Sequence, residues 1–106
     1  MIMTNTYDFS AFMARMAELD YHEILHEADA EIGRIERLSY GVKGAPRHRE
    51  MGSMEYASRI KAFLFYMRHG TRPGSARNSE FLSYRQVVEA LVRKRQFRAE
   101  ALDDFG

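Results

Sequence analysis

The sequence predicts an all-α fold, a compact single domain of four to five helices spanning residues 1–106. Apolar residues recur at helical spacing, no segment alternates apolar and polar residues with period two, and glycines or capping residues separate the apolar stretches. The chain has 106 residues and no cysteine, so a modest core without disulfides is expected. After a short flexible lead at residues 1–7, we expect helices at residues 9–19, 21–39, 53–69, 83–95 and 99–104.

The first two predicted helices are separated by a capping pattern. Asp8 is placed to cap the first helix, and its apolar stripe consists of Phe9, Phe12, Met13, Met16 and Leu19. Asp20 with Glu23 resembles a capping box, in which the Asp replaces the usual Ser or Thr. We therefore expect a break near Asp20, and one continuous helix over residues 9–39 is the alternative.

The third and fourth predicted helices begin at serines. Ser53 caps the third helix and Gly70 ends it, whereas Ser83 and Gln86 form a capping box for the fourth. Residues 79–82 are predicted to form a helical turn before it. A short last helix at residues 99–104 is expected to close the domain.

Two aromatic residues near the end of the third helix lie outside its apolar stripe. Phe65 and Tyr66 extend the apolar surface of the last two turns almost all the way round. We favour burial of both side chains, because large aromatic side chains are usually core residues. The alternative is an exposed aromatic patch that contacts a partner.

The sequence His22-Glu23-Ile24-Leu25-His26 resembles the HExxH motif of zinc-dependent proteases. In such a motif two histidines four positions apart share one helix face and bind zinc, while the glutamate acts as general base. The predicted apolar stripe of this helix consists of Tyr21, Ile24, Leu25, Ala28, Ile32, Ile35 and Leu38. The two histidines lie almost opposite this stripe, so we expect them at the surface without a third ligand. We therefore predict no catalytic residue, cofactor or metal, with a zinc-dependent hydrolase as the remote alternative. Ile24 and Leu25 are expected to matter for folding.

Charge is divided unevenly along the chain. Residues 1–42 carry eight acidic and three basic side chains, a net −5, and residues 43–106 carry thirteen basic and seven acidic ones, a net +6. This asymmetry has two interpretations: the chain binds a charged partner, or its two oppositely charged halves attract each other in the fold. Candidate partner-binding residues are the acidic Glu23, Glu27, Asp29 and Glu31, the basic Lys43, Arg47, Arg49, Arg72, Arg77, Arg93, Lys94 and Arg95, and the aromatic Phe65 and Tyr66.

In length, in helical character and in its lack of cysteine, the chain resembles small phage-encoded anti-CRISPR proteins that act on type I systems, type I-E among them. The resemblance implies a non-enzymatic inhibitor in the cytoplasm of the bacterial host, bound to the surveillance complex or to the Cas3 nuclease-helicase. It rests on no diagnostic motif, so it assigns no binding residues. The alternative is a nucleic-acid-binding protein that uses the basic residues. No membrane partner is expected, because the longest apolar run, residues 62–67, is too short to span a bilayer.

Overall fold

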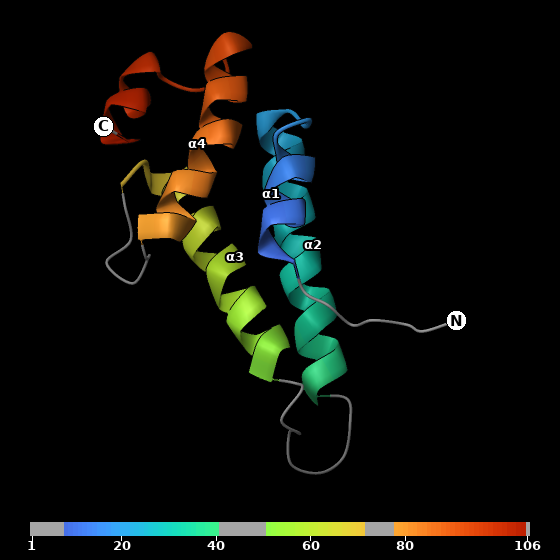
Figure 1. Ribbon diagram of the computed structural model, residues 1–106. Coiled ribbons are helices and arrows are strands. Elements are labelled where there is room, and N and C mark those ends of the chain that lie inside the picture. Colours follow the sequence, from blue (N-terminus) through green and yellow to red (C-terminus); the bar gives the residue numbers. More distant parts are fainter. Residues whose placement is uncertain (1–7, 41–50, 72–77, 106) are drawn as a thin grey trace.

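The chain folds into a bundle of helices, as predicted (Figure 1). The computed structural model describes residues 8–40, 51–71 and 78–105, and within these residues there are five helices and no strand. The helices are α1 (Phe9–Met16), α2 (Tyr21–Tyr40), α3 (Met51–His69), α4 (Asn78–Arg93) and the 3-10 helix η2 (Ala99–Phe105). The expected lead at residues 1–7 lies outside the described residues. No helix in the described part of the chain is long and apolar enough to cross a membrane.

The predicted break near Asp20 is confirmed. The side chain of Asp8 accepts a hydrogen bond of 3.1 Å from the N–H of Ala11, so Asp8 caps α1 as expected. The helix ends at Met16, before residue 19, and a turn precedes α2. At the start of α2 the N–H of Asp20 donates to Glu23 Oε1 over 2.9 Å, which is the side-chain half of a capping box.

The predicted starts of the next two helices are wrong. Ser53 lies inside α3, which begins at Met51, and Ser83 lies inside α4, which begins at Asn78. Residues 79–82 are helical, as predicted, but they belong to α4 itself. The hydroxyl of Ser83 donates a hydrogen bond of 2.6 Å to the carbonyl oxygen of Glu80 in its own helix. A serine that bonds back to its own helix in this way is tolerated in a helix interior, so serine alone does not mark a start.

The end of α3 is as predicted. Gly70 has a φ angle of +71°, and its N–H donates to the carbonyl oxygen of Tyr66 over 2.7 Å. A Cβ at this position would lie 2.9 Å from Nη2 of Arg98, so backbone conformation and close approach both favour glycine.

The end of α4 lies at Arg93 rather than at the predicted residue 95. The N–H of Gln96 donates to the carbonyl oxygen of Leu91 over 2.8 Å, and that of Arg95 donates to the carbonyl oxygen of Val92 over 2.9 Å. These two bonds form a Schellman motif, whose left-handed position is usually occupied by glycine. Here Arg95 occupies it with a φ angle of +60°.

The core combines aromatic side chains with aliphatic ones and methionines. Helix α2 packs against α3, α1 packs against α4, and η2 covers one side of α4 (Figure 1). Phe63 lies at the centre, with ring centroids 6.4 Å from Phe12 and 5.3 Å from Tyr84 in edge-to-face arrangements. The predicted stripe of α2 is buried at Ile24, Ala28, Ile32 and Ile35. Leu25 is partly buried against this core.

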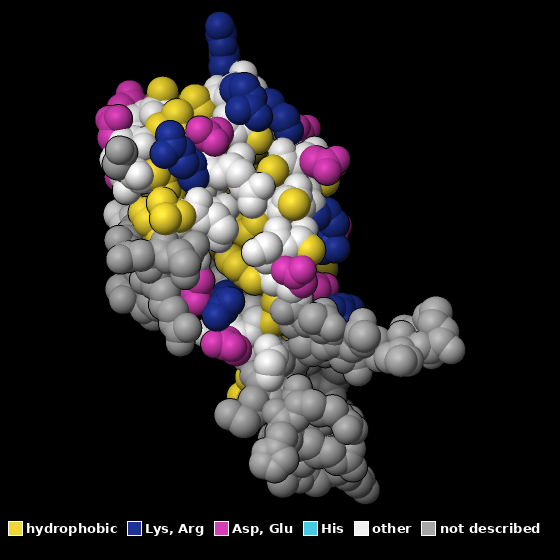
Figure 2. Space-filling view, viewed as in Figure 1, with side chains coloured by type: hydrophobic (Ala, Val, Ile, Leu, Met, Phe, Trp, Pro, Cys, Tyr) yellow, Lys and Arg dark blue, Asp and Glu magenta, His cyan; other side chains and the backbone are white. Residues whose placement is uncertain are grey.

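The two oppositely charged halves of the sequence meet in the fold. Acidic side chains from the first 42 residues form ion pairs with basic side chains from the remainder, and charges of both signs are interspersed on the face shown in Figure 2. The pairs are Glu36–Lys61 at 2.8 Å, Asp29–Arg68 at 2.7 Å and Asp20–Lys94 at 3.5 Å. Part of the charge asymmetry therefore serves contacts within the chain.

Candidate functional site

Phe65 and Tyr66 have different environments, although they are neighbours in sequence. Tyr66 is fully buried, and its hydroxyl donates to Asp104 Oδ2 in η2 over 3.1 Å. Phe65 is 44% exposed. The predicted burial is confirmed for Tyr66 and wrong for Phe65, because successive side chains diverge by about 100° around a helix and η2 covers only one of the two directions.

Phe65 belongs to an exposed strip along α3. Met54, which is 51% exposed, lies eleven positions earlier, a spacing of about three helical turns that places both side chains on one side of α3. The ring of His69 lies 4.5 Å from the ring of Phe65, centroid to centroid. We call Met54, Phe65 and His69 the Phe65 strip.

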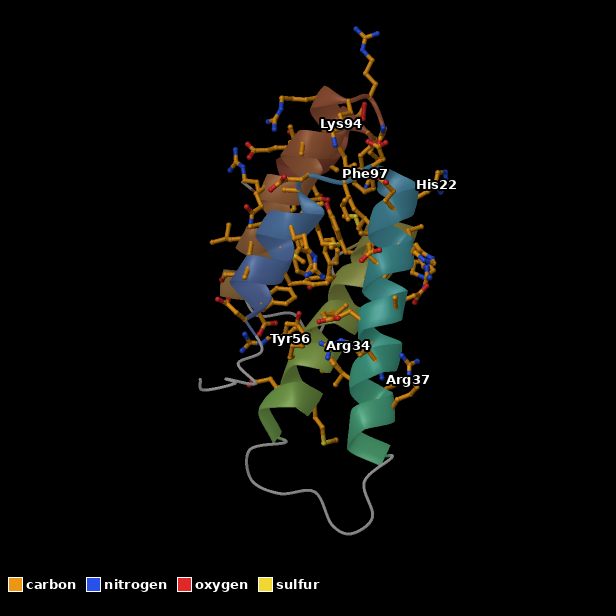
Figure 3. All side chains as sticks on the ribbon, turned by 90° about the vertical axis from the view of Figure 1, so that its right-hand side faces the viewer. His22, Arg34, Arg37, Tyr56, Lys94 and Phe97 are labelled. Carbon is orange, nitrogen blue, oxygen red and sulfur yellow. The ribbon has the colours of Figure 1, made fainter. Side chains whose placement is uncertain are left out.

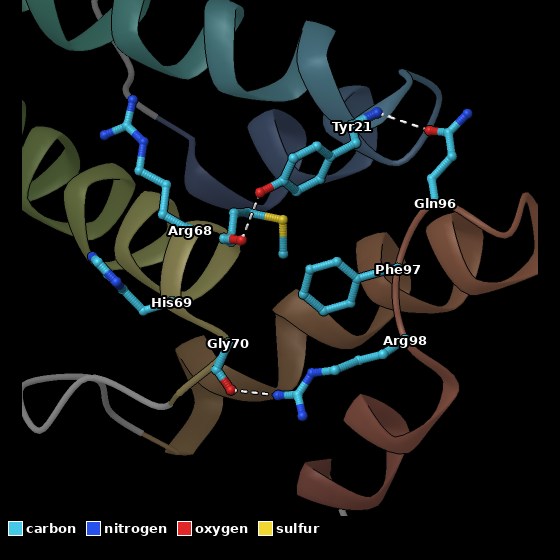
Figure 4. A pocket seen from close by; sticks show the side chains of 8 residues that line it. Tyr21, Arg68, His69, Gly70, Gln96, Phe97 and Arg98 are labelled. Carbon is cyan, nitrogen blue, oxygen red and sulfur yellow. Dashed lines mark hydrogen bonds between the residues drawn. The ribbon is translucent and has the colours of Figure 1, made fainter.

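A pocket with a volume of about 340 Å³ lies at the end of α3, where the strip reaches His69 (Figure 4). Three segments that are distant in sequence form it: the start of α2, the end of α3 and the link between α4 and η2. Its lining residues are Tyr21, Met67, Arg68, His69, Gly70, Gln96, Phe97 and Arg98. We call it the α3-end pocket.

Hydrogen bonds between the three segments fix the walls of the α3-end pocket (Figure 4). Tyr21 makes two of them: its N–H donates to Gln96 Oε1 over 2.8 Å, and its hydroxyl donates to the carbonyl oxygen of Met67 over 3.0 Å. Nη2 of Arg98 donates to the carbonyl oxygen of Gly70 over 2.6 Å. These hydrogen bonds join the start of α2, the end of α3 and the link after α4 around an open hollow.

The lining of the α3-end pocket contains two arginines and a histidine, and no acidic side chain. Outside the lining, Asp29 Oδ2 lies 2.7 Å from Nη2 of Arg68, and Asp104 Oδ2 lies 4.0 Å from Nη2 of Arg98. Each guanidinium has five N–H donors, so these contacts leave donors for a further acceptor. In Figure 4 the side chains of Arg68 and His69 extend away from Tyr21 and Phe97, whereas the guanidinium of Arg98 lies beside Gly70.

One of the acidic candidates, Glu31, is bound within the fold. Its side chain is 15% exposed, and it accepts hydrogen bonds from Arg34 at 2.9 Å and 3.0 Å and from the hydroxyl of Tyr56 at 3.0 Å (Figure 3). The Arg34 hydrogen bonds hold the pKa of Glu31 below its ordinary value, although burial opposes them. Burial and the adjacent carboxylate raise the pKa of Tyr56. Glu31 thus links α2 to α3.

The histidines of the HExxH sequence are exposed, as predicted, and His22 points away from the bundle (Figure 3). His22 and His26 line a second pocket of about 390 Å³ with Glu23, Glu27, Arg15 of α1 and Leu19 of the turn between α1 and α2. Within residues 8–40, 51–71 and 78–105, no group of three or more His, Cys, Asp or Glu side chains is arranged to hold a metal ion.

The basic candidates fall into three groups. Nζ of Lys94 donates to the carbonyl oxygen of Leu19 over 3.1 Å, so Lys94 joins the end of α4 to the turn before α2. Arg93 and Arg95 are exposed, and neither makes an ion pair with another described residue. The remaining basic candidates, Lys43, Arg47, Arg49, Arg72 and Arg77, lie outside the described residues.

The α3-end pocket was not predicted from the sequence. Tyr21 was expected on the apolar stripe of its helix, and its contact with Gln96 spans 75 positions, which no local pattern indicates. Gly70 was predicted to end α3, but the sequence did not indicate that Arg98 would contact it.

Comparisons of the chain with protein-family models, with curated proteins and with solved structures found no match. The Phe65 strip and the α3-end pocket are therefore candidate sites on their geometry alone.

Proposed function

We propose that this chain acts by binding another protein and that the Phe65 strip is its contact surface. The supporting observation is the 44% exposure of Phe65 on a long helix whose other apolar side is packed in the core. Exposed aromatic side chains on rigid elements are typical anchors of protein interfaces, because a partner can remove them from water at little cost in conformational entropy. Met54 lies on the same side of α3, with the exposed Ser58 and Lys61 between it and Phe65.

The partner proposed for this surface is a component of a type I CRISPR–Cas system, either the surveillance complex or Cas3. This part of the proposal is based on the resemblance in size and helical character to anti-CRISPR proteins. The chain would then be a non-enzymatic inhibitor in the cytoplasm of the bacterial host, which occupies its partner rather than modifying it.

A pull-down with the purified surveillance complex and purified Cas3, together with a phage plaque assay, tests the proposal. We expect one of the two to be captured and phage to be protected from interference. Phe65→Ala should weaken capture at least tenfold, whereas Leu82→Ala, which truncates a 56% exposed side chain on α4, should leave capture unchanged. Absence of capture and protection would overturn the proposed partner, and equal effects of the two substitutions would overturn the proposed surface.

Nucleic-acid binding is the second candidate, because Arg93 and Arg95 are exposed at the end of α4 without an ion pair among the described residues. Nucleic-acid binding predicts that the chain shifts DNA or RNA in a gel. The shift should weaken with added salt and with the double substitution Arg93→Ala and Arg95→Ala. Absence of a shift at low salt would eliminate it.

A further inference from the structure

We infer that two copies of this chain form a symmetric dimer through the outer face of α2 and α3, with Phe65 of each copy packed over Gly33 of the other. We call this surface the α2–α3 face. It consists of Asp29, Gly33 and Glu36 of α2 and of Lys61, Phe65 and Arg68 of α3. The inference does not rest on the proposed function, because it concerns the chain alone. It gives Phe65 a second occupant, which a partner protein would have to displace.

Two ion pairs show how α2 and α3, which pack side by side, are aligned on this face (Figure 1). Glu36 lies 2.8 Å from Lys61, and Asp29 lies 2.7 Å from Arg68. Between the two pairs α3 advances by seven positions while α2 goes back by seven, which is about two turns of each helix. The helices are therefore antiparallel and in constant register along this stretch.

Phe65 and Gly33 lie at the same level on opposite edges of the face. Phe65 follows Lys61 by four positions, and Gly33 follows Asp29 by four positions. Four positions turn a helix by about 40° beyond a full circle, which here leads away from the core on both helices. The edge at α3 thus carries an exposed aromatic ring, and the edge at α2 carries a partly exposed residue without a side chain.

The order of residues across the face is complementary to itself. From one edge to the other it runs from Gly33 through the acidic residues of α2 and the basic residues of α3 to Phe65. A twofold axis parallel to the helices places the basic row of one copy over the acidic row of the other and each Phe65 over a Gly33. An axis across the helices would instead place like charges together.

The ion pairs within each copy leave room for contacts between copies. Their four side chains are between 43% and 57% exposed, so each can contact an opposite charge on the second copy as well. The two aromatic rings supply the apolar part of the contact, and the charge rows determine its orientation.

Sedimentation equilibrium of the full chain at low salt tests the dimer. We expect Phe65→Ala and Gly33→Gln each to raise the dissociation constant of the dimer at least tenfold, whereas the control Leu82→Ala leaves it unchanged. Glutamine favours the helix and fills the space over position 33, and circular dichroism verifies that each variant is folded. A chain that is monomeric at about 1 mM would overturn the inference, and so would a dimer that Phe65→Ala does not weaken.

Exchange of one ion pair tests the axis. The double substitution Glu36→Lys and Lys61→Glu preserves the pair within a copy and the charge complementarity between two exchanged copies. A dimer of one exchanged and one wild-type copy would place two lysines together at one contact and two glutamates together at the other. Native mass spectrometry of an equimolar mixture should therefore show mixed dimers well below half of all dimers. Mixed dimers at the statistical half would overturn this axis.

The dimer and the proposed function can fail separately. The dimer is measured without a partner, and the proposed function is measured by capture with the surveillance complex or Cas3. Dimerisation without capture would support this inference and overturn the proposed function. Capture by a chain that stays monomeric would overturn this inference and leave the proposed function in place.

Discussion

The hydroxyl of Tyr56 in α3 donates a 3.0 Å hydrogen bond to Glu31 Oε2 in α2, and Arg34 binds the same carboxylate. This contact is one of several polar links between the two longest helices. Tyr56→Phe removes the hydroxyl and leaves Glu31 bound to Arg34. We expect a loss of about 1 kcal/mol in the free energy of unfolding, measured by urea denaturation at pH 7. An unchanged free energy would mean that water replaces the hydroxyl without cost.

Glu31 also makes stability depend on pH. Its pKa is lowered in the folded state from an ordinary value of 4.5, mainly by the hydrogen bonds from Arg34. The unfolded chain therefore binds the proton more readily, so this contribution is present above the ordinary pKa and is lost as pH falls through the folded value. We expect Glu31→Gln to be less stable than the wild type at pH 7 and to approach it in stability at pH 3. A constant difference between the two pH values would contradict this.

Arg95 occupies a backbone conformation that favours glycine. Its φ angle of +60° places its Cβ against the following carbonyl group. Arg95→Gly should therefore raise the free energy of unfolding by about 0.5–1 kcal/mol. Arg95→Ala is the control, since it removes the charge and keeps the Cβ, and it should give no such gain. Thermal unfolding of the three chains distinguishes relief of backbone strain from loss of charge.

Gly70 should not tolerate a side chain. Gly70→Ala combines a positive φ angle of +71° with a Cβ that would lie 2.9 Å from Arg98 Nη2. We expect a loss of about 1–2 kcal/mol from the backbone alone. Arg98→Ala removes the Nη2 atom that the new Cβ would approach. Gly70→Ala should therefore cost less stability in the Arg98→Ala background than in the wild type. A double-mutant cycle measures the difference, and strict additivity would contradict the close approach.

The features that could be predicted from the sequence are those set by neighbouring residues. The cap by Asp8, the break at Asp20 and the end of α3 at Gly70 each depend on a few consecutive residues. The buried stripe of α2 follows from the helical period in the same way. The predicted start of α4 at Ser83 was wrong, because the Ser83 hydroxyl donates a hydrogen bond to a carbonyl oxygen of its own helix. A serine can make this bond in a helix interior as well as cap a helix, so the sequence pattern fits both positions.

The features that could not be predicted depend on contacts between distant segments. Tyr66 is buried and Phe65 is not, because η2, some 35 positions later, packs on one side of α3. Glu31 and Lys94, both candidates for binding a partner, are instead engaged by Tyr56 and by the carbonyl oxygen of Leu19. The α3-end pocket requires Tyr21 and the link at residues 96–98 to meet. None of these pairings leaves a local pattern in the sequence.

The HExxH sequence gives a last prediction, which concerns folding. Ile24 is fully buried, Leu25 is partly buried, and the two histidines are exposed. Ile24→Ala should therefore cost about 2–5 kcal/mol and Leu25→Ala less, because the cavity left at position 24 is enclosed by the core. His22→Ala and His26→Ala should each change stability by no more than about 0.5 kcal/mol, as is usual for surface positions. Urea denaturation of the four variants, with and without equimolar zinc, tests this order. Stabilisation of the wild type by zinc that His22→Ala abolishes would contradict it, because the histidines would then hold a metal ion.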